Sequence, residues 1–322
     1  MREGLFLKRN IEKWKGYQAE EVTDPDEMAH RFTELVNDLG YSKTFYPHSK
    51  VTHYLNGLAS RIYLSIYQNK KEESSRIVRF WKTELPLTVR KHHRTFLYAF
   101  IIFTAFAIMA AFSSAHDETF VRGILGDQYV DMTEDNIASG DPFGVYKSQN
   151  EVDMFFWIAM HNIKVSFFCF VMGFFLSIGT IWLLFENGVM VGAFQYMFFA
   201  KSLGWASVLV IWIHGTLEIS AIIISGGAGL ILGNSILFPG THKRIDSLKQ
   251  GGKDGIKIMI GLVPIFITAA FLEGFITRHT AMPLPVSLLI LLASLTFIIW
   301  YFVIYPIRLE RKLSLKNNVA KS

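Results

Sequence analysis

The chain has 322 residues, of which 51% are hydrophobic and only 18% are charged, and its formal net charge is +5. A single cysteine, Cys169, excludes an intrachain disulfide framework. The apolar residues concentrate after residue 95, in runs long enough to cross a bilayer, which takes about 20 residues as a helix. This composition predicts a polytopic membrane protein rather than a soluble domain, and no cofactor or nucleic-acid partner is expected.

Residues 1–95 hold no such run and are rich in charge. Apolar residues recur at helical spacing from Phe6 to Tyr17, and again after the acidic stretch DPDE at residues 24–27, which is typical of a helix N-terminus. No alternation typical of a β-strand occurs. We predict a cytoplasmic α-helical region over residues 1–95 and an all-α fold for the whole chain.

Residues 96–306 are predicted to form a transmembrane helical domain with about six membrane segments. The third segment is only about 13 residues long, short enough to be re-entrant. An acidic outer loop over 115–163 follows the first segment, and a basic cytoplasmic tail over 307–322 follows the last. In chain order the apolar cores of the segments cover 96–113, 164–185, 188–200, 205–237, 257–276 and 285–305.

Three basic stretches indicate the orientation: KHHR at 91–94, the segment 241–257, and IRLERK at 307–312. With six crossings all three lie on one side, and the positive-inside rule makes that side cytoplasmic. We therefore expect a multi-pass protein of the cytoplasmic membrane with both termini in the cytoplasm. KHHR also suggests a metal site, but adjacent histidines do not share a helix face, so we interpret it as a basic membrane flank.

The longest apolar run contains two ionisable residues, His214 and Glu218, within the sequence WIHGTLEIS. A spacing of four residues places both on one helix face. An ionised group inside the bilayer costs at least about 2.5–3.5 kcal/mol, so such residues normally face protein and find partners. The polar residues of other segments that could supply those partners are Glu273, Lys164 and Asn162, and we expect all five to form an intramembrane polar cluster.

Two interpretations of this cluster stay open. In the first, the side chains satisfy one another and fix the register of the helices. In the second, they form a site for a proton, an ion or a small ligand. A lone HxxxE lacks the second histidine of the zinc-protease motif HExxH, which argues against hydrolytic chemistry and leaves a metal role undetermined.

Small residues follow the motif, with Ser225, Gly229 and Gly233 at four-residue intervals. In lipid this spacing lets helices approach closely. The face that they form serves either a homodimer or, as we prefer, packing within one subunit. Asn187 and Gly188 are predicted to form the turn between the second and third segments.

Four stretches occur in the order and spacing of a known family: HNIKVSFFCFVMG, LLFENGVMVGAF, HGTLEISAIIISGGAGLILG and AAFLEGFITRH. The chain resembles the stage II sporulation protein M family, and its N-terminal FLKRNIEKWKGY and YLNGLASRIYLSIY resemble the longer members. The resemblance implies a helical membrane fold. The sporulation member resembles a scaffold for peptidoglycan-degrading partners, but the long N-terminal region and acidic outer loop depart from that short form.

The expected function is that of a non-enzymatic integral membrane scaffold, which organises envelope or peptidoglycan-remodelling partners. Its partners would be the lipid bilayer and membrane or envelope proteins. The alternative is a transporter or channel for protons, ions or a small ligand that uses the intramembrane histidine, glutamate and lysine side chains.

Overall fold

The structure is a computed structural model of the full chain, and it describes residues 2–20, 22, 24–68, 76–147, 150–279 and 282–319. The described residues form helices and no strand, which confirms the all-α prediction. The contacts divide the chain into two compact units, Met1–Ile77 and Val78–Ser322. The division falls earlier than residue 95, because Leu85 and Val89 are buried in the core of the second unit.

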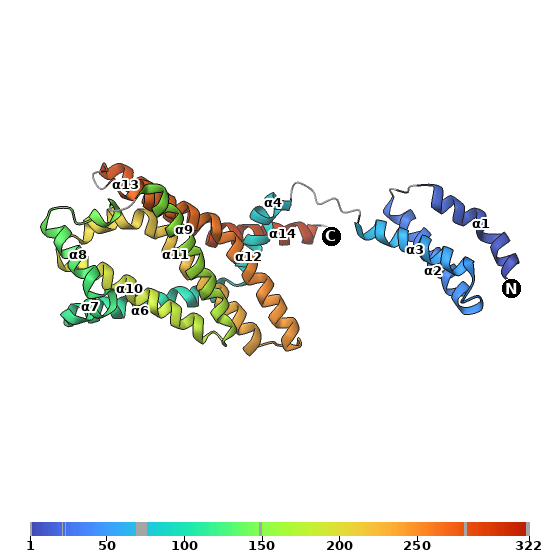
Figure 1. The fold of residues 1–322 in the computed structure, drawn as a ribbon, viewed down its shortest axis with the longest axis horizontal. Coiled ribbons are helices and arrows are strands. Elements are labelled where there is room, and N and C mark those ends of the chain that lie inside the picture. Colours follow the sequence, from blue (N-terminus) through green and yellow to red (C-terminus); the bar gives the residue numbers. More distant parts are fainter. Residues whose placement is uncertain are drawn as a thin grey trace. The chain divides into compact units, whose positions relative to one another are not determined.

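The first unit contains α1 (Glu3–Ala19), α2 (Pro25–Phe45) and α3 (Lys50–Gln68), which Figure 1 draws in blue. Asp24 caps α2, because its side chain accepts a hydrogen bond from the backbone N–H of Asp26 at 3.2 Å. One residue from each helix is fully buried, so that the three helices share one core: Trp14, Leu35 and Leu55.

Among the described residues of the second unit, six helices are long and apolar enough to cross a membrane, which confirms the predicted number of segments. Their α-helical parts are α6 (His93–His116), α9 (Glu151–Val171), α10 (Ile178–Ala200), α11 (Gly204–Leu237), α12 (Arg244–Phe271) and α13 (Leu284–Ile299).

The second and third of these helices differ from the prediction. α9 begins at Glu151 rather than at 164, and the chain turns at Phe175–Ser177, where Leu176 and Ser177 have positive φ angles of 52° and 67°. The third helix, α10, therefore has 23 residues, and the prediction of a short third segment is wrong. Asn187 and Gly188 lie inside α10, so the predicted turn there is also wrong.

The polar residues of α10 are satisfied without a turn. The indole N–H of Trp182 donates to Glu186 Oε1 at 2.9 Å, and Asn187 Nδ2 donates to the carbonyl oxygen of Leu183 at 2.8 Å. Because each polar side chain finds a partner one turn earlier, the helix continues through them. Gly188 instead serves close packing, since a Cβ there would lie 2.8 Å from the carbonyl oxygen of Phe103 on α6.

α11 is the central helix of the second unit, and it packs against α6, α9, α10, α12 and α13 (Figure 1). Residues 221–233 are all buried. A Cβ on Gly229 would lie 2.3 Å from Thr180 Oγ1, and one on Gly233 would lie 2.0 Å from Ser177 Oγ. The face formed by Ser225, Gly229 and Gly233 therefore packs inside the chain.

The two ends of the helical bundle are built differently. At one end lie α7 (Glu118–Leu125) and α8 (Asp127–Ala138), which replace much of the predicted outer loop and are joined by ion pairs of Arg122 with Asp131 and Glu134 at 2.6 and 3.1 Å (Figure 1). At the other end lie a π-helical segment (Phe80–Glu84), α5 (Leu85–Lys91) and α14 (Tyr305–Val319). We call these the α7–α8 end and the α5–α14 end.

Candidate functional site

Three ionisable residues from two helices come together inside the second unit. One ligand atom each of His214, Glu218 and Glu273 lies within 4.8 Å of the others. His214 Nε2 lies 3.8 Å from Glu273 Oε2. We call these three residues the polar centre. It lies nearer the α7–α8 end, because α11 begins and α12 ends there.

The backbone changes where Glu273 joins the centre. α12 continues into a π-helical segment, Leu272–Thr277, whose wider turn holds Glu273 and Thr277 on the side that faces α11. Single π-turns inside α-helices are frequent at functional sites. Thr277 is 1% exposed, and its Oγ1 lies 3.0 Å from His214 Nδ1. Sequence patterns did not single out Thr277, because a π-turn leaves no spacing signal.

The hydrogen bonds of Thr277 orient the imidazole ring of His214 and favour one of its tautomers. The Thr277 hydroxyl donates its one hydrogen to the carbonyl oxygen of Leu272 at 3.1 Å. With that hydrogen used, Oγ1 accepts from His214 in the tautomer that carries its proton on Nδ1 and its lone pair on Nε2. The lone pair of the imidazole is thus turned toward the Glu273 carboxylate.

Asn162 of α9 lies beside this centre. Its side chain is directed at the Glu218 carboxylate, and the residue is only 6% exposed. The approach is close, yet Nδ2 makes no hydrogen bond of normal geometry with any described residue. One turn further along α9, Ser166 is wholly buried, and its hydroxyl is also unpartnered among the described residues. The side of the polar centre that faces α9 therefore holds buried polar atoms without a hydrogen bond of normal geometry.

Lys164 does not join the polar centre. Its side chain is exposed on the outside of α9, and the ion pairs of the described residues do not include it. The prediction that it compensates the carboxylates required it to lie at the entrance of a helix starting at residue 164. Because α9 begins thirteen residues earlier, Lys164 lies near the middle of the helix instead.

Apolar side chains enclose the polar centre along the bundle axis. Toward the α7–α8 end it is covered by a cluster that includes Ile158 and Ile211. Toward the α5–α14 end it is covered by a larger cluster that includes Ala221 and Phe266. Such surroundings strengthen electrostatic interactions between the groups that they enclose.

The family model for stage II sporulation protein M matches residues 99–278, which include the whole polar centre, Asn162 and Thr277. The chain belongs to the stage II sporulation protein M family. A second family model, described as a domain of unknown function (DUF8413), matches residues 4–68 and thus the first unit. No curated protein and no solved structure matches the chain.

A second cluster of polar residues lies at the α5–α14 end of the second unit. Asp254 of α12 is buried, and its Oδ2 accepts from Lys91 Nζ at 2.7 Å and lies 3.0 Å from His92 Nε2. Gln250 donates to Oδ1 at 2.9 Å. The basic flank KHHR is thus tied to α12. Asp254 was missed by sequence reasoning, although an isolated acidic residue just before an apolar run was a usable signal.

The same end carries a further ion pair, which joins Lys257 of α12 to Glu84, a residue that precedes α5 and lies outside the membrane segments. Lys257 Nζ donates to Glu84 Oε2 at 3.1 Å. This hydrogen bond lowers the pKa of the Glu84 carboxyl from its ordinary value. It ties the π-helical segment before α5 to α12.

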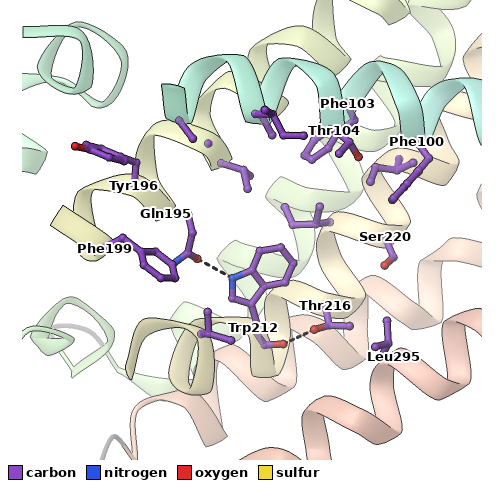
Figure 2. Close-up of a pocket in the computed structure, with 18 of the residues that line it drawn as sticks. Phe100, Phe103, Thr104, Gln195, Tyr196, Phe199, Trp212, Thr216, Ser220 and Leu295 are labelled. Carbon is purple, nitrogen blue, oxygen red and sulfur yellow. Dashed lines mark hydrogen bonds between the residues drawn. The ribbon is translucent and has the colours of Figure 1, made fainter. Parts of the chain in front are cut away.

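An apolar cavity of about 760 Å³ lies on another side of α11, between that helix and α6, α10 and α13. Figure 2 shows Trp212 and Gln195 joined in its wall, where the indole N–H donates to Gln195 Oε1 at 2.8 Å. Thr216 also lines the cavity. Residues two apart on a helix do not face the same way, so the Thr216 side and the Glu218 side of α11 differ. The cavity is therefore separate from the polar centre.

Proposed function

We propose that this membrane protein is a non-enzymatic scaffold of the cytoplasmic membrane, with both termini in the cytoplasm, that holds other membrane or envelope proteins. The observation that carries the proposal is the position of Lys164. The membrane helix runs from Glu151 to Phe174, so Lys164 lies close to its midpoint. Its side chain faces outward from the bundle.

A lysine in that position calls for a partner. An ammonium group at the centre of a membrane helix costs about 2.5–3.5 kcal/mol on insertion scales, and such groups normally pair with another group. Met160 and Phe168 lie one turn before and one turn after Lys164 on the same face, and they are 65% and 51% exposed. This face suits a membrane helix of a partner that carries a carboxylate among apolar residues.

The first unit supports the same proposal. It has its own core around Trp14 and is compact by itself. A separately folded helical unit attached to a membrane domain provides a second surface for partners. The ion-paired helices α7 and α8 provide a further one at their end of the bundle.

The separation of the two polar groups speaks against a transport path. Glu273 and Asp254 are 19 residues apart, which is about 28 Å along the helix at ~1.5 Å per residue. Between them, α12 buries Ile258, Leu262 and Phe266 at 0–1% exposure in the main apolar cluster. A transporter needs a site that reaches each side in turn, and this packed layer offers no polar step.

Transport of a proton or cation is the second candidate. It is favoured by three ionisable groups at ligand distance inside a membrane domain. The proline inside α12, Pro264, and the π-helical segment beyond it are irregularities of the kind that moving helices use.

Site-specific photo-crosslinking in native membranes tests the scaffold proposal. A photoreactive residue at Phe168 is expected to capture a membrane protein, while the same residue at Leu289 of α13, which is 69% exposed, serves as the control. Lys164→Leu is expected to abolish the adduct at Phe168. Adducts that are the same at both positions, or that persist in Lys164→Leu, would contradict the proposal.

A further inference from the structure

The polar centre has the dimensions of a metal site. Nitrogen and oxygen ligands bind a zinc-sized ion at about 2.0–2.2 Å, so two ligand atoms of one ion lie at most about 4.4 Å apart. The ligand atoms of His214, Glu218 and Glu273 already lie within 4.8 Å of one another. A rotation of one side chain closes the remaining gap.

The charges of the centre require a cation or protons. Two carboxylates lie close together in a low-dielectric interior, and among the described residues no lysine or arginine pairs with Glu218 or Glu273. Lys164, the lysine expected to compensate them, is turned away. Uncompensated buried charges are strongly unfavourable, and a divalent cation neutralises both carboxylates at once.

The histidine is oriented as a ligand. Thr277 holds Nδ1, which leaves the Nε2 lone pair turned toward Glu273 Oε2 at 3.8 Å. A histidine nitrogen and a carboxylate oxygen in this arrangement can share a proton or bind one cation together. Metal-binding histidines are commonly fixed in this way, with the second ring nitrogen donating to an oxygen of the protein.

Asn162 is the independent observation. The residue is 6% exposed, its amide approaches the Glu218 carboxylate, and Nδ2 makes no hydrogen bond of normal geometry with a described residue. A buried amide is normally satisfied by bonds of good geometry, so one that lacks such a bond beside a carboxylate points to a further ligand at this centre. Rotation of the amide by half a turn presents its oxygen to the centre as a fourth ligand atom.

We infer that His214, Glu218, Glu273 and Asn162 bind one divalent transition-metal ion, of the Zn²⁺ or Mn²⁺ type. One imidazole nitrogen with three oxygen atoms suits these ions. Mg²⁺ and Ca²⁺ favour sites made of oxygen alone. The ion would hold α9, α11 and α12 together from inside the bundle. Ions can reach the site past Glu273, because 15% of the Glu273 side chain is exposed.

Metal analysis of the full-length protein tests this inference. Protein purified without a histidine tag is expected to contain one transition-metal ion per chain. After chelation it should take up Zn²⁺ or Mn²⁺ with the same stoichiometry. Co²⁺ bound in their place should give a visible absorption spectrum of nitrogen and oxygen ligation. Wild-type protein that is folded and binds none of the three ions would overturn the inference.

Variants assign the ion to this site. Glu273→Gln and Asn162→Leu are expected to abolish or strongly weaken binding, and Thr277→Val to weaken it about 10–100-fold through the orientation of His214. Glu186→Gln, the same exchange at an exposed glutamate of α10, is the control and should bind like wild type. Size-exclusion chromatography identifies folded variants. Unchanged binding in folded Glu273→Gln and Asn162→Leu would place the ion elsewhere and contradict the inference.

The metal site does not depend on the scaffold role. Crosslinking through the Lys164 face can fail while the ion is present, and the ion can be absent while the crosslink forms. A negative result in one experiment therefore leaves the other proposal unaffected.

Discussion

His214 and Thr277 are joined between two membrane helices by a hydrogen bond of 3.0 Å between the imidazole Nδ1 and the threonine hydroxyl oxygen. Thr277 reaches His214 because α12 ends in a π-helical turn. This contact fixes the orientation of the imidazole ring and thereby the direction of Nε2 toward Glu273. The chemistry of the polar centre thus depends on a residue that is not itself ionisable.

Removal of that contact should destabilise the protein. In Thr277→Val the Nδ1 atom of His214 loses its hydrogen-bond partner inside the bundle, which costs about 1–3 kcal/mol. Thr268→Val is the matched control, because Thr268 is exposed on the same helix and should change stability by no more than about 0.5 kcal/mol. Thermal unfolding in detergent, with a chelator present, measures both. Equal melting temperatures for the two variants would argue against the assigned hydrogen bond.

Helix packing between α6 and α10 gives a second prediction. A Cβ on Gly192 would lie 2.1 Å from the carbonyl oxygen of Ala107, so Gly192→Ala should separate the two helices and cost about 1–3 kcal/mol. Gly215→Ala places the same methyl group on α11, where nothing lies within 4 Å, and should be neutral or stabilise by up to about 1 kcal/mol. The melting temperatures of the two variants should shift in opposite directions from that of wild type, or at least differ clearly from each other. A tolerated alanine at 192 would contradict the observed packing.

Part of this architecture could be predicted from the sequence. The six membrane helices follow from apolar runs, since a bilayer leaves helices few alternatives to satisfy their backbone groups. The four-residue spacing of His214 and Glu218 was enough to place them on one helix face. The order of four sequence motifs was enough to recognise the family, and the family implies a helical membrane fold.

The errors have physical causes. Glu186, Asn187 and Gly188 form a typical turn sequence in water, but here Trp182 and the backbone of Leu183 satisfy the polar groups inside a helix. The actual turn at Phe175–Ser177 consists mostly of apolar residues and carries no polar signal. That shift of boundaries moved Lys164 from a helix end to its middle. Contacts between distant segments, such as those of Asp254 and Thr277, leave no local pattern.

The first unit should fold alone and respond to acid through Glu34. Tyr17 donates a hydrogen bond to Glu34, and this bond, followed by the charge of Lys13, lowers the pKa of the Glu34 carboxyl from 4.5. A lowered folded-state pKa adds stability above the unfolded value and loses it as the pH falls through the folded value. Residues 1–77 should therefore be more stable than their Glu34→Gln variant at neutral pH, and this difference should shrink well below pH 4.5.

Urea unfolding of the expressed unit at both pH values measures this difference. Glu12→Gln is the control, because Glu12 is 83% exposed and its loss should change stability little at either pH. A Glu34→Gln variant as stable as wild type at neutral pH would refute the role of this pair.

The orientation of the membrane domain is testable with single cysteines. Ser139 follows α8 and Thr241 lies between α11 and α12, and both residues are exposed. In a Cys169→Ser background, Ser139→Cys should react with a membrane-impermeant thiol reagent added to intact cells, because we place the α7–α8 end outside. Thr241→Cys between α11 and α12 should react only after the membrane is opened. Labelling of position 241 from outside would invert the proposed topology.

Ion flux into liposomes tests most directly whether the polar centre is closed toward the α5–α14 end by the apolar layer of Ile258, Leu262 and Phe266. Purified full-length protein reconstituted in vesicles should pass no protons and no Zn²⁺ or Mn²⁺ above the level of empty vesicles, and Glu218→Gln should give the same trace. Robust flux in wild type that folded Glu218→Gln abolishes would contradict the account and make the polar centre a transport site.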